Sequence, residues 1–225
     1  MLERLKLIGT SHIASQSKKT IKKEFSEFQP DFMAVELDIN RFKALKNNEK
    51  QSLSLSSIRH IGFTGFVFAV VGRIIQKKLG KTVGITPGSE LMLGASLAKN
   101  NNLKLFLIDQ DIRITLKNLS KRMTFKEKRT MLWEVIKSPF SKKKLKIDLS
   151  KVPEQELINI LMEEMRTKYP SIYSSLVEDR NKYMAKHIFK ILKNWPEHKL
   201  MAIVGAGHKE GIEQYLKTLI DNNLT

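Results

Sequence analysis

Short apolar runs, separated by longer stretches with helical periodicity, are the feature that most constrains the fold of this chain. Four such runs occur, at Leu5–Ile8, Phe32–Leu37, Leu103–Ile108 and Leu200–Val204. Alternation of strand-like runs with helical patterns is typical of α/β proteins. We therefore predict a single α/β domain over residues 1–225, with a mixed, largely parallel central sheet flanked by helices.

Helical patterns fill the intervals between the apolar runs. They cover Ser15–Phe28, Ile61–Leu79, Ser89–Lys99, Ile112–Leu119, Phe125–Lys137, Glu154–Tyr169, Tyr173–Leu192 and Lys209–Ile220. The uncharged stretch from Ile61 to Gly72 is shorter than the ~20 residues of a spanning helix, so we expect a core helix, with membrane-surface contact as the alternative. Segment 117–192 is predicted to be a helical insertion before the last strand that forms a lid, a dimer interface or both.

Composition excludes several classes of protein. The chain contains no cysteine, which rules out disulfide scaffolds, thiolate zinc sites and cysteine nucleophiles. Its N-terminus has neither a long apolar core nor a small-residue cleavage site, so we predict no signal peptide. Both observations favour a cytoplasmic protein.

The formal net charge is +17, and about half of it lies in one segment. Residues 117–146 carry eleven Lys and Arg side chains against Glu127 and Glu134. Such a surplus attracts anionic lipid, nucleic acid or acidic peptide. Phe125, Trp133 and Phe140 are spaced by eight and seven residues, which we interpret as a buried helical stripe. That interpretation leaves segment 117–146 as a solvated basic face, with an anionic membrane surface as its candidate partner and nucleic acid as the weaker option.

Ligand-type side chains follow all four predicted strands. The segments are Gly9-Thr10-Ser11-His12, Glu36-Leu37-Asp38, Asp109-Gln110-Asp111 and Gly205-Ala206-Gly207-His208. Ligands of open α/β sheets bind beyond the carboxyl ends of the strands, so parallel strands would gather two imidazoles and several carboxylates in one crevice. Such donors suit a divalent Zn, Mn, Co or Fe ion, which acidifies a bound water. The pattern therefore predicts a metal-dependent hydrolase.

The two histidine segments share the spacing Gly-x-x-His, which indicates two equivalent ligands near helix starts. Each residue also has a structural explanation. His12 could cap the next helix and His208 could be an exposed first-turn residue, while Glu36 could simply pair with Arg41. The remaining histidines, which we predict to be structural or exposed, are His60, His187 and His198.

Other polar residues at helix starts have similar alternatives. Asp109 and Asp111 could cap the helix that follows them. Glu90 lies in the first turn of a predicted helix, where the helix dipole favours a carboxylate. The glycine-rich loop 205–211 is too close to the end of the sequence for a dinucleotide site, which requires a further strand and an acidic residue about 20 positions on.

Six motifs in a fixed order resemble the TraB/PrgY family. They are Gly9-Thr10-Ser11-His12; Val35-Glu36-Leu37-Asp38 with Arg41; Pro87-Gly88-Ser89-Glu90; Leu107-Ile108-Asp109-Gln110-Asp111-Ile112 with Thr115-Leu116; Asp179-Arg180-Asn181 with Met184-Ala185; and Val204-Gly205-Ala206-Gly207-His208-Lys209-Glu210-Gly211-Ile212. This family includes the pheromone-shutdown proteins and is related to the Tiki proteases and, more distantly, to the erythromycin-esterase and ChaN-like proteins. The resemblance covers residues 5 to about 220.

The resemblance implies a mixed α/β domain with metal-dependent peptide hydrolysis at the two Gly-x-x-His segments. It makes His12 and His208 metal ligands and Glu36 a ligand or general base. Further polar positions of the pattern fall on Arg41, Glu90 and Arg180, which we expect to orient the ligands or stabilise developing negative charge. The departures from the pattern are Gln110 and Lys117 in place of arginines and Asp179 in place of glutamate.

Many relatives carry C-terminal membrane helices, whereas this sequence ends just after its second Gly-x-x-His helix. We therefore expect a stand-alone version, attached to membranes at most through its basic face. The leading hypothesis is a metal-dependent hydrolase of peptides or small polar substrates. The alternative is a non-catalytic protein that sequesters a peptide or haem-like ligand, or docks on an anionic membrane. A homodimer remains an option in either case.

Overall fold

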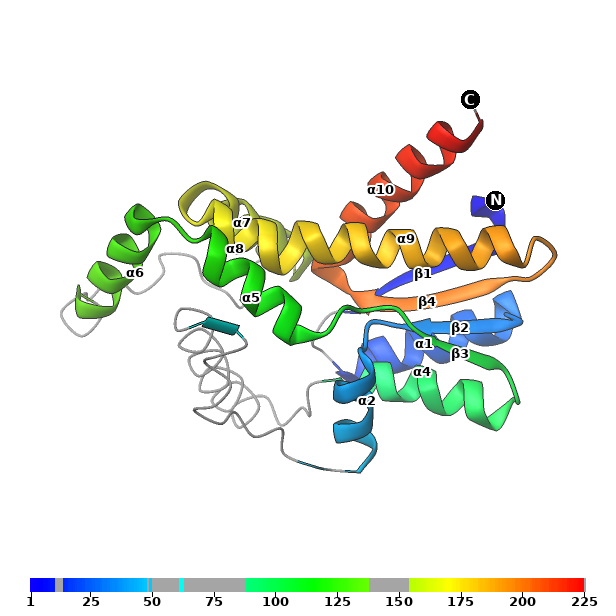
Figure 1. The fold of residues 1–225 in the computed structure, drawn as a ribbon. Coiled ribbons are helices and arrows are strands. Elements are labelled where there is room, and N and C mark those ends of the chain that lie inside the picture. Colours follow the sequence, from blue (N-terminus) through cyan, green and yellow to red (C-terminus); the bar gives the residue numbers. More distant parts are fainter. Residues whose placement is uncertain (11–13, 48, 50–60, 63–87, 138–153, 225) are drawn as a thin grey trace.

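The computed structural model describes residues 1–10, 14–47, 49, 61–62, 88–137 and 154–224 (Figure 1). Its four strands are β1 (Leu5–Thr10), β2 (Phe32–Val35), β3 (Lys104–Leu107) and β4 (Leu200–Gly205). They form one sheet in the order β1-β4-β2-β3, and the three neighbouring pairs are parallel. The predicted α/β fold is therefore confirmed, and the last strand of the sequence lies between the first two.

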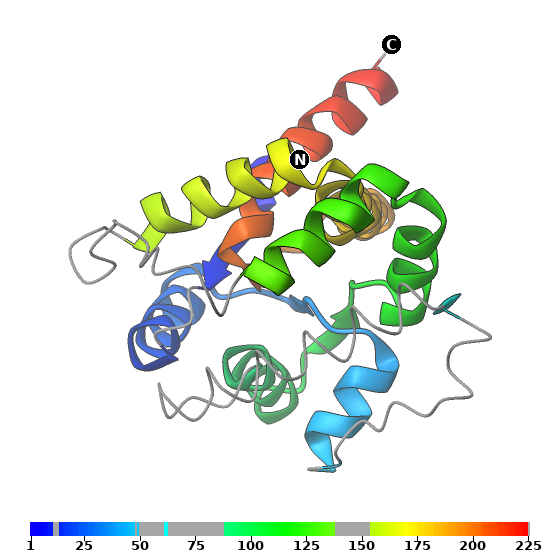
Figure 2. The same cartoon turned by 90° about the vertical axis from the view of Figure 1, so that its left-hand side faces the viewer.

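Helices cover both faces of this sheet (Figures 1 and 2). One face carries α1 (Ala14–Phe28) and α4 (Ser89–Asn100), and the other carries α9 (Asp179–Asn194) and α10 (Ala206–Leu224). Alternate residues of β4 supply the two cores, because side chains of a strand point to opposite faces. Ala202 and Val204 pack with α9 and α10, whereas Met201 and Ile203 pack with α1 and α4.

The strand register brings the carboxyl ends of the strands to one edge of the sheet. Thr10 is paired with Gly205, and Val35 is paired with Ile203. Because all pairs are parallel, residues that follow β1, β2, β3 and β4 emerge at this same edge. The candidate residues of the strand ends therefore start from neighbouring positions.

Two short helices begin at this edge through aspartate caps. The helix α2 (Ile39–Lys46), which the sequence analysis missed, starts at Asp38, whose carboxylate accepts hydrogen bonds from the amides of Asn40 and Arg41. The helix α5 (Ile112–Arg122) starts at Asp111 in the same way. The capping interpretation of Asp111 is confirmed.

The helical region between β3 and β4 has two distinct parts. Besides α5, its first part contains α6 (Phe125–Lys137), α7 (Glu154–Lys168), α8 (Pro170–Tyr173) and a π-helical turn, η3 (Ser174–Glu178). Its second part, α9, packs directly on the sheet through buried residues such as Met184 and Ile188. Within segment 117–192, α9 thus belongs to the helical layer that covers one face of the sheet. The chain begins with a single 3-10 turn, η1 (Leu2–Arg4).

One expectation about α6 is wrong. Phe125 is 80% exposed and Trp133 is 57% exposed, so they do not form a buried stripe. The side of α6 that faces the protein instead carries Glu127, which is 4% exposed, and Met131. Phe140 lies outside the described residues. The predicted core helix 61–79 also lies outside them, except for its first two residues, of which Ile61 is buried.

None of the helices in the described part of the chain is both long and apolar enough to cross a membrane.

Candidate functional site

Three of the polar residues at the strand ends meet in a buried cluster. Glu36 directly follows β2, Asp109 lies two residues after β3, and His208 is in the first turn of α10. Each of them is less than a tenth exposed. The Nε2 atom of His208 lies 3.5 Å from Oε1 of Glu36. His12, the second predicted imidazole ligand, lies outside the described residues.

Arg180 joins the members of this cluster, which we call the Arg180 cluster: Glu36, Asp109, Arg180 and His208. The guanidinium donates to both carboxylate oxygens of Asp109, at 3.0 Å from Nε and 2.7 Å from Nη2, and Nη2 also donates to Glu36. Its Nη1 lies 2.9 Å from Nε2 of His208. With a side chain only 16% exposed, Arg180 forms buried, charge-assisted contacts to three other elements of the fold.

The π-helical turn before α9 helps to hold Arg180 in place. Nη1 of Arg180 donates to the backbone carbonyl of Leu176, in η3, over 3.3 Å. A π-turn interrupts the regular i to i−4 ladder, so carbonyls of the turn become accessible to other donors. The Leu176 carbonyl thus gives the Arg180 guanidinium a further hydrogen-bond acceptor that carries no charge.

Asn181 orients the imidazole of His208. Its side-chain oxygen lies 2.7 Å from Nδ1 of His208. The guanidinium of Arg180 can only donate, so Nε2 of His208 must accept the hydrogen bond between them. The ring proton is therefore on Nδ1, which donates a hydrogen bond to Oδ1 of Asn181. Gly211 allows this contact, since a Cβ at residue 211 would come within 2.1 Å of Nδ2 of Asn181.

Burial and neighbouring charges shift the pKa values of Glu36, His208 and Arg180. Burial alone would raise the pKa of Glu36, but at the acidic pH where Glu36 titrates, the charge of protonated His208, the charge of Arg180 and a hydrogen bond from the Gly205 amide lower this pKa to about 2. Burial lowers the pKa of His208, and Arg180 adds to this although Glu36 and Asp109 oppose it. Burial disfavours the charged form of Arg180, but Glu36 and Asp109 raise its pKa above the usual value.

The net charge of the cluster follows from these shifts. Among these four side chains, two carboxylates face one guanidinium and one neutral imidazole, so the four together carry one negative charge, on which the more distant charge of Arg41 also acts. A surplus of negative charge beside a neutral imidazole nitrogen is an environment that favours a bound cation.

Arg41 and Glu90 lie outside the direct contacts of the Arg180 cluster. Arg41, half-buried on α2, lowers the pKa of Glu36 further through its charge, after the larger effects of burial and the closer groups. Glu90 is buried in the first turn of α4 and accepts a hydrogen bond from the Ser89 hydroxyl over 3.3 Å. Within the described residues, no hydrogen bond or ion pair links Glu90 to the cluster.

Two of the residues that depart from the family pattern contact residues outside the Arg180 cluster. Gln110 donates to the hydroxyl of Thr115 over 2.7 Å, inside the turn that opens α5. Asp179 forms an ion pair with Arg122, with 2.6 Å between the charged atoms. The sequence indicates Asn181 only as part of a motif, and Asp109 as a strand-end candidate, a motif residue and a possible helix cap. Their partners are 27 and 71 residues away in the sequence, so spacing alone carries no signal of these contacts.

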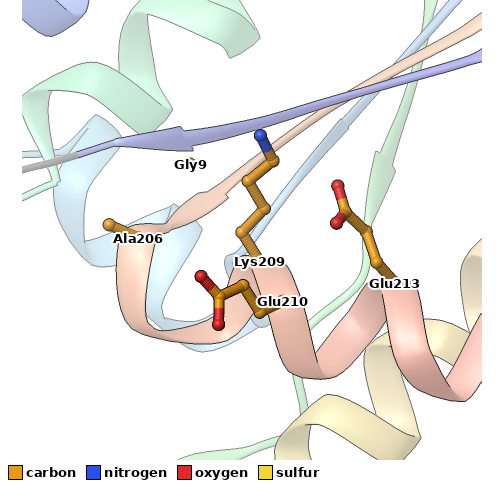
Figure 3. A pocket seen from close by; sticks show the side chains of 5 residues that line it. All are labelled: Gly9, Ala206, Lys209, Glu210 and Glu213. Carbon is orange, nitrogen blue, oxygen red and sulfur yellow. The ribbon is translucent and has the colours of Figure 1, made fainter. Parts of the chain in front are cut away.

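A pocket of about 400 Å³ opens beside β1, at the same edge of the sheet (Figure 3). It is lined by Gly9, Ala206, Lys209, Glu210 and Glu213. The four lining residues of α10 are spaced by three, one and three positions and share one side of the helix, whereas His208 projects from the opposite side. The first turn of α10 therefore separates the pocket from the Arg180 cluster.

The comparison with known proteins decides the family. A model of the TraB/PrgY/gumN family matches residues 3–225. The chain belongs to this family. An uncharacterized protein of Methanocaldococcus jannaschii is 40% identical over 220 residues, which cover 96% of this chain and 54% of that relative. The TraB domain-containing proteins of Homo sapiens and Mus musculus are each 24% identical over 241 residues, covering 96% of this chain and 63% of each relative.

This TraB-family chain thus spans between about half and two thirds of the length of the relatives it matches. The names of the two mammalian relatives give a domain, and none of the three names states a reaction. Its activity therefore has to be argued from the Arg180 cluster and the pocket.

Proposed function

We propose that this TraB-family chain is a metal-dependent hydrolase that acts on peptides or small polar substrates. The ligands would be His208 and Glu36, with His12 as the third, and the ion a divalent Zn, Mn, Co or Fe. The observation that supports this best is the pair of donor atoms, Nε2 of His208 and Oε1 of Glu36, at 3.5 Å in a buried position beyond the strand ends.

The chemistry of the donors fits a divalent ion in part. A neutral imidazole, an ionised carboxylate and a surplus negative charge are what such an ion requires. Among the described residues, however, no group of three or more His, Asp or Glu side chains is arranged to hold a metal. The described residues therefore offer two ligands of the proposed set, and the third depends on His12.

Arg180 contacts the two atoms that the proposed ion would need. Its guanidinium lies against Nε2 of His208 and Oε1 of Glu36, so it competes with the ion for these donors. Asp109 accepts two hydrogen bonds from the same guanidinium and is therefore a second carboxylate partner for it. His208 and Glu36 would hold the ion, and Asp109 would hold the guanidinium of Arg180 beside it.

The remaining roles follow from position. A bound divalent ion would supply water acidic enough to act as hydroxide near neutral pH. Asn181 fixes the tautomer that leaves Nε2 of His208 free to donate its lone pair. Arg41, whose charge already acts on Glu36, would stabilise negative charge that develops on a substrate, and Glu90 would orient the polar groups at the start of α4.

The pocket beside β1 is large enough for part of a substrate, since ligand pockets usually measure about 300–1,000 Å³. Lys209 and Glu213 are half-buried in its wall, and neither makes a hydrogen bond or ion pair with the rest of the described chain. They would bind the charged groups of a peptide, while the bond to be cleaved lies across the first turn of α10.

Metal content tests the proposal. The protein is purified without chelator, and its metal is measured by plasma mass spectrometry before and after addition of Mn and Co. We expect near-stoichiometric metal in the wild type and its loss in His12→Ala and His208→Ala. The matched control is His187→Ala, which removes a half-buried imidazole on α9 that contacts the Tyr183 carbonyl and ring, away from the proposed ligands. Unchanged metal in both ligand variants would reject the ligand set.

A second function is supported by a specific observation. Arg180 pairs with both Glu36 and Asp109, so the two buried carboxylates have a cationic partner without a metal ion. A site that binds a ligand without catalysis would be stable in this form. The alternative is therefore a protein that sequesters a peptide without cleaving it. Incubating metal-loaded protein with a peptide library distinguishes the two, because new masses indicate hydrolysis, whereas retention of intact peptides indicates sequestration.

A further inference from the structure

One side of the helix α6, which carries Glu127 and Met131, holds it to other described elements of the protein. Glu127 accepts hydrogen bonds from the amide and hydroxyl of Thr124, and the Thr124 hydroxyl accepts from the Glu127 amide, which together form a capping box. The same carboxylate accepts from the amide and hydroxyl of Ser171, at the start of α8. One turn on, Met131 packs in a small apolar cluster with Leu119.

The opposite side of α6 carries aromatic and basic side chains that face solvent. Phe125, Arg129 and Trp133 follow one another at intervals of four residues, so they lie along one stripe of the helix. Phe125 is 80% exposed, Trp133 is 57% exposed and Arg129 is exposed as well. Lys126 and Lys128, both exposed, flank this stripe. We call these five residues the outer face of α6.

The surroundings of the outer face are strongly basic. From Ile112 to Lys137 the chain carries eight Lys and Arg residues against Glu127 and Glu134. Glu127 is turned inward and bonded, so it does not offset the positive charge at the surface. Figure 1 shows α6 at the end of the molecule away from the sheet.

We propose that α6 docks this TraB-family chain on an anionic lipid surface. Phe125 and Trp133 enter the boundary between headgroups and acyl chains, where aromatic side chains are favoured. Lys126, Lys128 and Arg129 contact the anionic headgroups, as the basic residues of interfacial helices do. The occupant is a lipid surface because the aromatic and basic side chains share one exposed side of a single helix, as in interfacial helices, whereas single-stranded nucleic acid is usually held in a basic groove.

Vesicle co-sedimentation with the full chain tests this proposal. We expect binding to vesicles that contain about 30% phosphatidylserine in phosphatidylcholine, weak binding to pure phosphatidylcholine, and loss of binding at high salt. Two variants are informative: Phe125→Ala with Trp133→Ala, and Lys126→Gln with Lys128→Gln and Arg129→Gln. Each is expected to weaken binding by about tenfold or more, because each removes one of two attractions that act together.

The matched control removes the same charge elsewhere. Lys19, Lys22 and Lys190 are exposed lysines on α1 and α9, and their triple change to Gln should alter binding by less than about twofold if the outer face is the contact. Circular dichroism of each variant shows that the fold is retained. In a Trp195→Phe background, Trp133 is the one tryptophan left, and its emission should shift to the blue on the same vesicles.

Three outcomes would overturn the proposal. One is no binding to the anionic vesicles at low salt. Another is binding that the outer-face variants and the control weaken equally, which would indicate a diffuse attraction of the +17 charge. The third is that the outer-face variants abolish binding to single-stranded RNA or self-association while no variant changes vesicle binding. The result is independent of whether the Arg180 cluster holds a metal.

Discussion

At the scale of single residues, Arg180 determines how two carboxylates coexist in a buried place. Glu36 and Asp109 come from the ends of neighbouring strands and are both less than a tenth exposed. Two such charges repel each other unless a cation lies between them. The guanidinium fills that role with a planar set of donors, which a lysine ammonium does not offer.

Removing Arg180 should therefore be costly to the fold. Arg180→Met leaves two buried carboxylates without their cation, so we expect the free energy of unfolding to fall by about 3–5 kcal/mol in metal-free protein. The control is Arg113→Met, because the Arg113 side chain is 65% exposed and pairs with Asp111 at the surface, where such pairs contribute about 1 kcal/mol or less. Urea unfolding in the presence of chelator measures both. Equal effects would contradict the central position of Arg180.

The lowered pKa of Glu36 predicts how stability changes with pH. Its pKa is about 2 in the folded protein and 4.5 ordinarily, so the folded state holds its proton less tightly. The resulting stability is present above pH 4.5 and is lost as the pH falls from there toward about 2. Urea midpoints of chelated protein between about pH 6 and about pH 3 should fall less steeply in Glu36→Gln than in the wild type. Glu210→Gln, which removes an exposed carboxylate of α10, should keep the wild-type slope.

The sequence predicts only part of the cluster at this scale. Parallel strands bring their carboxyl ends together, so Glu36, Asp109 and His208 were expected to be neighbours. Arg180 and Asn181 lie on a helix that starts far from any strand end, and they were singled out only because a family motif includes them. No residue pattern indicates that a helix will turn its guanidinium toward three separate elements.

At the scale of elements, the contact between α9 and α10 sets the orientation of His208. Residue 211 has no side chain, and this allows α10 to approach Asn181 on α9. Glycine inside a helix costs about 0.5–1 kcal/mol relative to alanine, so the close approach is maintained against helix propensity.

Gly211→Ala tests this contact. Its Cβ would lie 2.1 Å from Nδ2 and 2.9 Å from Cγ of Asn181, so we expect a net loss of about 1–3 kcal/mol despite the better helix propensity. Adding Asn181→Ala should recover part of this loss, because it removes the clashing atoms. Thr218→Ala, an exposed change on the same helix, should stay within about 0.5 kcal/mol of the wild type. A Gly211→Ala protein that is more stable than the wild type would contradict this expectation, because it would mean that Asn181 and α9 move away from the added Cβ at little cost.

Element prediction succeeded where apolar periodicity was strong. All four strands and the helices α1 and α4 were expected within about two residues of their observed bounds, whereas α9 begins six residues after its predicted start at Tyr173 and α10 extends beyond its predicted bounds at both ends. The helix α2 was missed because it has only eight residues, and its cap Asp38 was interpreted as a strand-end ligand. The π-turn η3 widens the backbone without interrupting the apolar pattern, so the sequence gives no sign of it. In α6, aromatic residues were assumed to be inside, whereas the capping box directs Glu127 inward.

At the scale of the whole molecule, a bound ion should stabilise the fold by mass action. The proposed ligands come from the first and the last parts of the chain, so an unfolded chain would bind the ion poorly. At a free ion concentration 100-fold above Kd, the gain would be about 2.7 kcal/mol.

Thermal unfolding measures this gain. We expect the Tm of the wild type to rise with added Zn, Mn, Co or Fe and to return to its initial value with chelator. The same additions should leave the Tm of His208→Ala unchanged and should shift that of His187→Ala as in the wild type. A shift of equal size in His208→Ala would show that the ion binds elsewhere.

The order of strands in the sheet also has a consequence for how the protein is made. The strand β4 lies between β1 and β2, yet it is the last strand to leave the ribosome, nearly 170 residues after β2 begins. Until then β1 has no hydrogen-bonded neighbour in the described sheet, and β2 has only β3. The edges of β1 and β2 that pair with β4 therefore stay unpaired through most of synthesis, and unpaired strand edges are prone to aggregation. Nascent chains that stop before residue 200 should be chaperone clients, and insertion of β4 completes the sheet and the Arg180 cluster in one late step.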